Sequence, residues 1–197
     1  VGSRVVTEAL ARGHDVTAAV RHDAGLDKLP EDVTPIVADV SDPAALAAAM
    51  AGQDLAISAV RSPAGREGEI VALTRSILDA ASIVDLRVII VGGAARLRLP
   101  DGSPHTVLSA PDFLPDSIVP TARASLAQWE LCAAEASTKW TYASPSALLQ
   151  PGTRRGTFRT GTDTLLVDET GNSEVSMEDL AMAIVDEAEC ARFPRAA

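Results

Sequence analysis

Aromatic residues, lysine and cysteine are scarce in this 197-residue chain. Aromatic residues make up 3% of the sequence, so the core must be built mainly from aliphatic side chains. The two lysines are Lys28 and Lys139, and the one tyrosine is Tyr142. Cys132 and Cys190 lie too far apart in the sequence for a C-x-x-C metal or redox pair, and two cysteines make no disulfide framework.

Positive charge and long apolar runs are also lacking. The 17 Lys and Arg residues stand against 27 Asp and Glu, a formal net charge of −10, whereas a nucleic-acid partner needs a basic surface. No apolar run reaches the ~18 residues of a membrane span, and no basic-then-apolar leader opens the sequence. No pair of histidines has metal-ligand spacing. We therefore expect a cytoplasmic protein with no nucleic-acid, membrane or metal partner.

The remaining sequence alternates between β-branched runs and amphipathic segments. Strands are predicted at 15–20, 34–38, 54–60, 87–91 and 140–143, with two short ones near 157–160 and 164–167. Helices are predicted at 3–12, 43–51, 69–82, 121–136 and 176–189, and a long irregular loop at 94–120. Such alternation favours βαβ units, and hence an α/β fold with a doubly wound parallel sheet in one domain, 1–197.

Ligands of such sheets bind beyond the carboxyl ends of the strands. Small residues dominate these positions in the sequence, which favours a flat ligand such as a nucleotide. The strand-end residues are Arg21 and His22, Asp39, Ser58 to Arg61, Gly92 to Ala95, and Ser144 to Ala147.

The segment from Val1 to Leu10 resembles the end of a Gly-rich dinucleotide fingerprint, with Gly2 as its last glycine. The whole chain then resembles the atypical short-chain dehydrogenase/reductases, in the NAD(P)H-binding branch that includes NmrA-like proteins and NADH-flavin reductases. The matching pieces are Val20-Arg21, Ala38 to Asp42, Ile57 to Val60, Val91 to Ala94, Trp140 to Tyr142, and Glu174 to Ala181. The resemblance implies a Rossmann-type domain whose first strand precedes Val1 and whose final strand follows the last helix. It also implies a dinucleotide-binding core at 1–144 and a substrate-side part at 145–197.

The resemblance assigns roles to the strand-end residues. Arg21 would meet the adenosine ribose, where a basic residue pairs with a 2′-phosphate and favours NADP over NAD, and His22 would assist it. Asp39 would accept from the adenine amino group, with Val40 against the ring. The helix that begins at Gly2 would direct its N-terminus at the pyrophosphate. Ser58, Ala59 and Val60 would line the ribose and pyrophosphate, and Gly92 and Gly93 would leave room for nicotinamide.

The chain departs from the family where proton transfer is concerned. Related reductases use a Tyr-x-x-x-Lys pair, but the matching helix, 121–130, contains neither residue. Arg96 stands near the usual serine position, and Tyr142 is expected to be a packing residue. No catalytic residue is therefore assigned. Three functions remain open: hydride transfer to an acceptor such as FMN or FAD, NADP(H) sensing without catalysis, and, less favoured, epimerisation of a nucleotide sugar.

Three residues of the 94–120 loop are candidates for contact with an acceptor. His105 would lie above the proposed nicotinamide position, and Asp112 and Phe113 would cover an acceptor ring. His14 is expected to be structural. The sequence leaves the acceptor and the oligomeric state undetermined.

Overall fold

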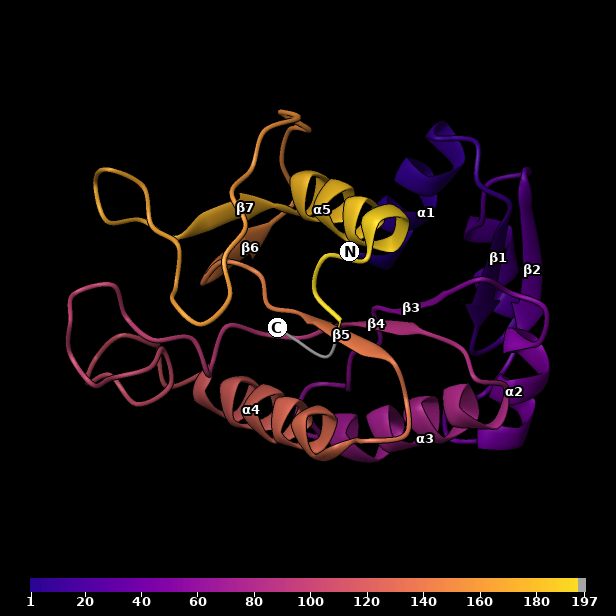
Figure 1. The fold of residues 1–197 in the computed structure, drawn as a ribbon, viewed down its shortest axis with the longest axis horizontal. Helices are drawn as coiled ribbons and strands as arrows, with labels where there is room; N and C mark the ends of the chain where they lie inside the picture. Colours follow the sequence, from indigo (N-terminus) through magenta and orange to yellow (C-terminus); the bar gives the residue numbers. More distant parts are fainter. Residues whose placement is uncertain (195–197) are drawn as a thin grey trace.

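The computed structural model describes residues 1–194, in which strands and helices alternate as the sequence predicts (Figure 1). The strands are β1 (Val16–Val20), β2 (Val33–Val37), β3 (Ala56–Ser58), β4 (Val88–Val91), β5 (Trp140–Ala143), β6 (Leu148–Gln150) and β7 (Glu174–Ser176). The helices are α1 (Gly2–Ala11), α2 (Pro43–Met50), α3 (Glu69–Ile83), α4 (Val119–Ala134) and α5 (Met177–Cys190), with a short 3-10 helix, η1 (Asp23–Lys28), after β1.

All pairs between these strands are parallel, which confirms the predicted α/β class. The described strands form three sheets, β1–β2, β3–β4–β5 and β6–β7. In the central sheet Val88 of β4 is in register with Ala56 of β3 and Trp140 of β5. β6 and β7 lie in the C-terminal part, beside the N-terminal end of α5 (Figure 1).

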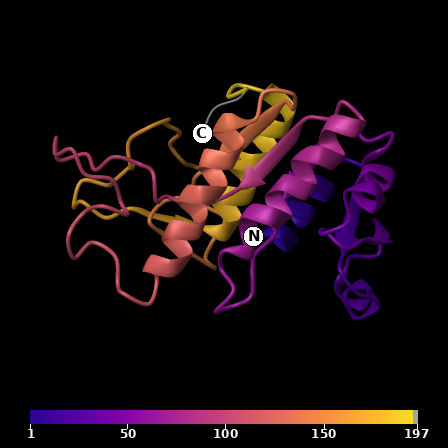
Figure 2. The ribbon, with the colours of Figure 1, turned by 90° about the horizontal axis from the view of Figure 1, so that it is seen from below.

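Helices cover both faces of the central sheet. In Figure 1, α3 and α4 lie below it and α1 and α5 above it, and Figure 2 shows α3 and α4 side by side. Ile89 of β4 packs in the cluster that includes α5, whereas Val88 and Ile90 pack in the cluster that includes α3. All three side chains are fully buried, as a continuous apolar run predicts for a strand covered on both faces. No helix among residues 1–194 is long and apolar enough to cross a membrane.

Local side-chain chemistry sets two helix starts. Asp42 precedes Pro43, the first residue of α2, and accepts from the backbone N–H groups of Ala44 and Ala45 at 3.0 and 3.1 Å. Ser176 accepts from the N–H of Asp179 at 2.9 Å and caps α5. Both starts agree with the sequence prediction.

The predicted strands near 157–160 and 164–167 are wrong. Residues 157–163 are irregular, and Thr164 makes a single bridge, to Arg98. The backbone immediately before them is held by a side chain: the buried Asp179 accepts from the N–H groups of Arg155 and Gly156 at 2.8 and 3.1 Å. The backbone that leads into the first predicted strand is thus bonded to a side chain and not to a neighbouring strand.

Candidate cofactor site

The residues predicted to hold a cofactor lie at the carboxyl ends of β1 to β4 or at the start of α1. They fall into three local groups: one after the adjacent strands β1 and β2, one where α1 meets the end of β3, and one after β4. The ten are Gly2, Arg21, His22, Asp39, Val40, Ser58, Ala59, Val60, Gly92 and Gly93.

The first group follows the adjacent strands β1 and β2. Arg21 Nε lies 3.9 Å from Asp39 Oδ2, and both side chains are largely exposed. The N–H and hydroxyl of Ser41 donate to Asp39 Oδ1 at 2.9 and 2.8 Å and, with the charge of Arg21 as a smaller cause, hold the pKa of Asp39 below its ordinary value. Asp39 is therefore a ready acceptor, next to a cation. His22 follows Arg21 as the exposed N-cap of η1.

The second group joins α1 to the end of β3. A Cβ added to Gly2 would lie 3.5 Å from the Cβ of Ala59, so the first turn of α1 lies against the residue that follows β3. Ser58, the last residue of β3, is 9% exposed. Val40 and Val60 pack against the core cluster shared by α2 and α3. The structure thus brings the predicted pyrophosphate helix next to the predicted ribose residues.

The third group is packed tightly. A Cβ on Gly92 would lie 1.8 Å from the Cζ of Tyr142, and one on Gly93 would lie 2.7 Å from the Oγ of Ser125 in α4. The N–H of Gly93 donates to the Tyr142 hydroxyl at 3.2 Å. The ring of Tyr142 therefore occupies the position where a side chain of residue 92 would lie. The fold requires a glycine here whether or not a ligand binds.

Tyr142 is a packing residue, as its strand position predicts. It is 1% exposed, and its hydroxyl lies 2.9 Å from the carbonyl oxygen of Ser125 and 3.2 Å from Oε1 of Gln128. Burial raises its pKa well above the ordinary range for tyrosine. Lys139 pairs with Asp85 on the surface at 3.2 Å, and Lys28 ends η1. Neither lysine therefore pairs with Tyr142 in the way that a Tyr-x-x-x-Lys pair requires for proton transfer.

Two segments beyond the ends of β4 and β5 form one body, which we call the loop lobe (residues 94–118 and 158–167). Both extend to the same side of the molecule in Figure 1. Its core consists of Leu97, Val107 and Leu165, each 6% exposed or less. Arg98 joins the segments, because its N–H donates to Asp163 O and its carbonyl accepts from Leu165 N, both at 2.8 Å. The predicted irregular loop is thus a packed structure.

Arg96 fastens the loop lobe to α4. Its guanidinium lies 5.0 Å from the ring centre of Trp129, donates to Asp163 Oδ1 at 2.9 Å and to the carbonyl of Thr162 at 3.0 Å. The Arg96 side chain is 10% exposed. A buried cation that is stacked and paired in this way is an anchor rather than a proton donor.

A cavity of about 150 Å³ lies between β5, α5 and the second segment of the loop lobe. Its wall includes Ser144, Phe158, Leu165, Leu180 and Ile184, and none of the ten predicted cofactor residues. The sequence analysis placed Ser144 near the site but missed Phe158 and the rest of this wall. Leu180 and Ile184 lie in the helix that the sequence predicts at 176–189, whereas Phe158 and Leu165 come from a glycine-punctuated stretch in which strands were wrongly predicted.

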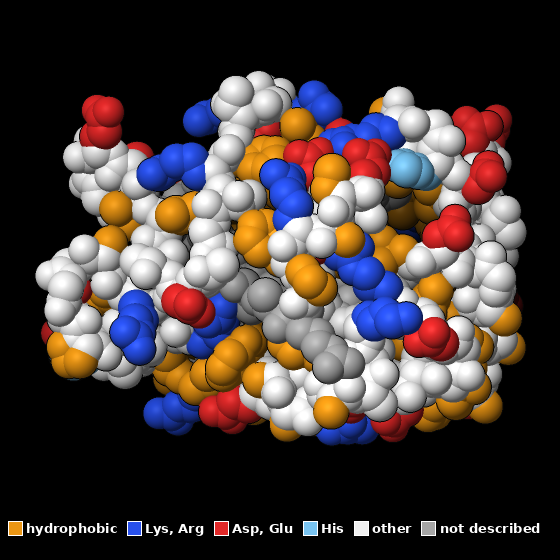
Figure 3. Space-filling view, in the orientation of Figure 1, with side chains coloured by type: hydrophobic (Ala, Val, Ile, Leu, Met, Phe, Trp, Pro, Cys, Tyr) orange, Lys and Arg blue, Asp and Glu red, His pale blue; other side chains and the backbone are white. Residues whose placement is uncertain are grey.

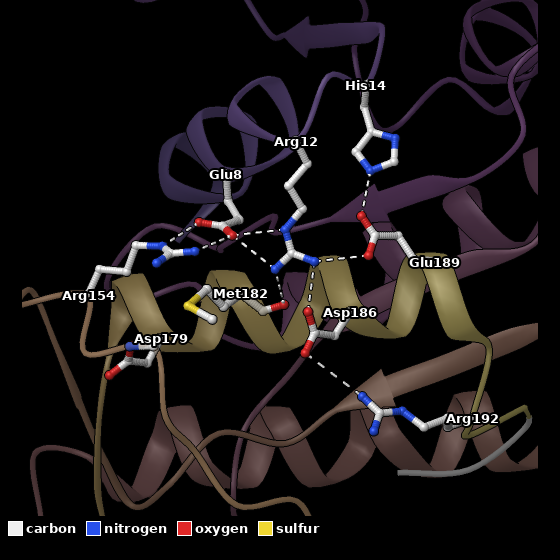
Figure 4. A network of polar contacts seen from close by, with 10 residues as sticks. Glu8, Arg12, His14, Arg154, Asp179, Met182, Asp186, Glu189 and Arg192 are labelled. Atoms are coloured by element: carbon white, nitrogen blue, oxygen red, sulfur yellow. Dashed lines mark hydrogen bonds and ion pairs between the residues drawn. The ribbon is translucent and has the colours of Figure 1, made fainter.

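Charged side chains hold α1 against α5. Glu8, 6% exposed, accepts from Arg154 at 2.8 and 2.9 Å and from Arg12 at 2.9 Å (Figure 4). These partners, Arg154 first, lower the pKa of Glu8 to about 2. Arg12 also pairs with Asp186 at 2.7 Å. Figure 3 shows the acidic, basic and histidine side chains that meet on this face.

His14 belongs to the same network. Its Nε2 lies 2.9 Å from Glu189 Oε1, and this contact agrees with the structural role that the sequence predicts for it. The network matters for the cofactor site because it fixes the helix that carries Gly2.

Comparisons with known proteins agree with this geometry. A family described as NAD(P)H-binding matches residues 1–190. The Bacillus subtilis (strain 168) protein YwnB, which is uncharacterized, is 30% identical over 190 residues, which is 95% of this chain and 87% of YwnB.

Two solved structures are similar along the whole chain. A "putative exported protein" from Burkholderia pseudomallei is 38% identical with a TM-score of 0.87, and the match covers 100% of this chain and 91% of that one. The "putative NADH-flavin reductase" SP1627 from Streptococcus pneumoniae TIGR4 is 26% identical with a TM-score of 0.87, and covers 99% and 90%. With a family match over 1–190 and a Rossmann-like arrangement of parallel strands, the chain belongs to the NAD(P)H-binding family.

Proposed function

We propose that this protein is an NAD(P)H-dependent reductase that passes hydride to a flat conjugated acceptor of the flavin type, without a Tyr/Lys pair. The buried, fully hydrogen-bonded Tyr142 carries the proposal, because it removes the one tyrosine from acid–base chemistry. An acceptor that takes its proton from solvent needs no such group. The similarity to the Streptococcus pneumoniae protein supports a flavin as that acceptor.

The residues present fit a dinucleotide. A Cβ at Gly2 would meet Ala59 at 3.5 Å, so the first turn of α1 lies beside the predicted ribose residues, and its N–H groups would donate to a pyrophosphate. Arg21 would pair with a 2′-phosphate, and His22 would lie beside it. Asp39, kept ionised by Ser41, would accept from the adenine amino group.

The rest of the site would hold the reacting rings. Ser58 and Val60 would border the ribose, Val40 would lie against the adenine, and Gly92 and Gly93 would form the floor below nicotinamide. When bound, the reduced cofactor supplies a hydride from C4 of nicotinamide, a flavin accepts it at N5, and solvent supplies the proton. The work of the chain is then to hold two rings face to face and exclude water between them.

The test is a fluorescence titration of the protein with NADPH and NADH, followed by addition of FMN. We expect NADPH to bind at least 10-fold more tightly than NADH and to be oxidised when FMN is added. Arg21→Glu should reverse the preference, because a carboxylate repels a 2′-phosphate and accepts from a 2′-hydroxyl. Arg66→Glu, a charge change of the same size on the loop before α3, is the matched control and should leave both affinities unchanged.

The outcomes separate the candidate functions. Failure of both dinucleotides to bind would refute the proposal. Tight binding of NADPH without oxidation by FMN or any other acceptor would support the alternative, an NADP(H) sensor of the NmrA kind. The lack of a visible acid–base group is what keeps this alternative open.

We also propose that the protein acts in the cytoplasm. Cys132 and Cys190 are both free, which suits a reducing compartment. Fractionation of the source cells with an antibody to this protein tests the proposal, which fails if the protein is found outside the cytoplasm.

A further inference from the structure

The hydroxyl of Tyr142 lies at the centre of a set of buried hydrogen bonds that reaches the candidate cofactor site. It accepts from the N–H of Gly93 at 3.2 Å, and it lies 2.9 Å from the carbonyl oxygen of Ser125 and 3.2 Å from Oε1 of Gln128. Nε2 of Gln128 in turn donates to the hydroxyl of the buried Thr74 at 2.9 Å. The network therefore joins α3, α4 and β5 to the backbone that follows β4.

The network assigns a direction to each hydrogen bond of Tyr142. The amide of Gln128 turns its NH₂ group to Thr74 and its oxygen to Tyr142, and the carbonyl of Ser125 can only accept. The hydroxyl proton is therefore shared between these two oxygens, and the hydroxyl oxygen is left to accept from Gly93. A phenylalanine ring would fill the same space but would leave the N–H of Gly93 without this partner.

The backbone at Gly92 and Gly93 is held from several directions. The N–H of Gly92 donates to the carbonyl of Ala143 in β5 at 3.0 Å. The ring of Tyr142 lies where a side chain of residue 92 would be, and the hydroxyl of Ser125 lies where one of residue 93 would be. The position of this backbone is thus set by side chains of β5 and α4, because the two glycines have none of their own.

We propose that Tyr142 is a positioning residue for nicotinamide: its hydroxyl holds the N–H of Gly93 and its ring supports Gly92. The inference rests on the proposed reductase function, in which these two glycines form the floor below nicotinamide, and it adds a residue that acts on the cofactor through the backbone. Hydride transfer depends steeply on the placement of the reacting atoms, so a small shift of the floor slows it. The adenosine half, at Arg21 and Asp39, is not affected.

The experiment compares Tyr142→Phe with Thr138→Val, a matched control that also loses one buried hydroxyl group. Thr138 is 2% exposed and its hydroxyl donates to the carbonyl of Leu78 at 3.2 Å. It precedes β5, at the end of the sheet opposite to Gly93. The Kd is measured for NADPH and for 2′-phospho-ADP-ribose, which keeps the adenosine half and lacks nicotinamide. Turnover is followed as NADPH oxidation with FMN.

We expect Tyr142→Phe to raise the Kd of NADPH about 5-fold and to lower kcat about 10-fold, while the Kd of 2′-phospho-ADP-ribose stays within about 2-fold. Thr138→Val should leave all three quantities within about 2-fold of the original protein, although each variant lowers the unfolding temperature because it loses a buried hydrogen bond. The two binding measurements test the proposal whether or not FMN is the acceptor.

Two results overturn the proposal. One is a Tyr142→Phe protein that binds NADPH as tightly as the original protein. The other is an equal loss of affinity for both ligands, which marks a purely structural role. If Tyr142→Phe does not fold, Ser125→Ala takes its place, because it removes the hydroxyl that lies against Gly93 and puts a good helix former into α4.

The same criteria apply to Ser125→Ala: a selective loss of affinity for NADPH supports the proposal, and an unchanged affinity or an equal loss for both ligands overturns it. Failure of the original protein to bind NADPH would instead refute the underlying reductase function.

Discussion

Gly2 and Gly92 are both predicted to line the same cofactor, but they lie in opposite surroundings. Gly2 has ordinary space around it, with its nearest neighbour at van der Waals distance from an added Cβ. Gly92 has none, because the ring of Tyr142 already fills the position of a side chain. The nucleotide side of the site, with Arg21 and Asp39 in solvent, leaves its residues free for a ligand. The nicotinamide side is constrained by the fold itself.

The comparison implies that replacing glycine with alanine affects the stability of the protein differently at Gly92 and at Gly2. Gly92→Ala should destabilise the protein by about 3 kcal/mol, because its methyl group overlaps a buried ring that cannot move without disturbing Gln128 and Ser125. Thermal or urea unfolding measures this loss. The control is Gly68→Ala, at a glycine with open space and a helical φ of −63°, which should change the stability by less than about 0.5 kcal/mol. A Gly92→Ala protein as stable as the control would contradict the comparison.

The second prediction concerns the ion pairs of Glu8, which hold α1 on the nucleotide side of the candidate site. Glu8→Gln should destabilise the protein by about 2 kcal/mol at pH 7, because two arginines lose their buried partner. The folded protein holds the pKa of Glu8 at about 2, below its ordinary value of 4.5. The contribution is therefore complete above pH 4.5 and is lost as the pH falls towards about 2.

Unfolding free energies measured between pH 7 and pH 2.5 test this. The difference between the original protein and Glu8→Gln should shrink as the pH decreases. A difference that stays constant over this range would show that Glu8 acts through its shape and not through its charge.

The smallest effect on stability is expected at Gly2. Gly2→Ala should change the free energy of unfolding by less than about 0.5 kcal/mol, because the new methyl group meets Ala59 at an ordinary distance. The affinity for NADPH should nevertheless fall by at least 10-fold if a pyrophosphate approaches the start of α1. Calorimetric unfolding and NADPH titration on the same sample separate the two effects. Unchanged affinity would remove Gly2 from the proposed site.

Local patterns in the sequence were sufficient for much of the fold. The run Val88–Val91 predicts a strand buried on both faces, and Asp42 with Pro43 predicts the start of α2, because each signal depends only on neighbouring residues. Residues 157–167 gave no reliable local signal. Their conformation depends on Asp179, Arg96 and Leu165, whose partners are distant in the sequence.

The candidate site shows the same division. The sequence placed Arg21, Asp39 and Gly92 at strand ends, since strand order alone brings such positions to one edge of a parallel sheet. It could not show that Tyr142 occupies the space beside Gly92, because that contact joins positions 50 residues apart.

The sequence by itself therefore predicted the five helices and the first five strands in their order, through periodicity and caps, and its small residues at strand ends favoured a nucleotide as the ligand. Only the tertiary structure decided which of those small residues face open space and which face a side chain. The physical reason is that a missing Cβ has the same appearance in a sequence whether the space is taken by a ligand or by the core.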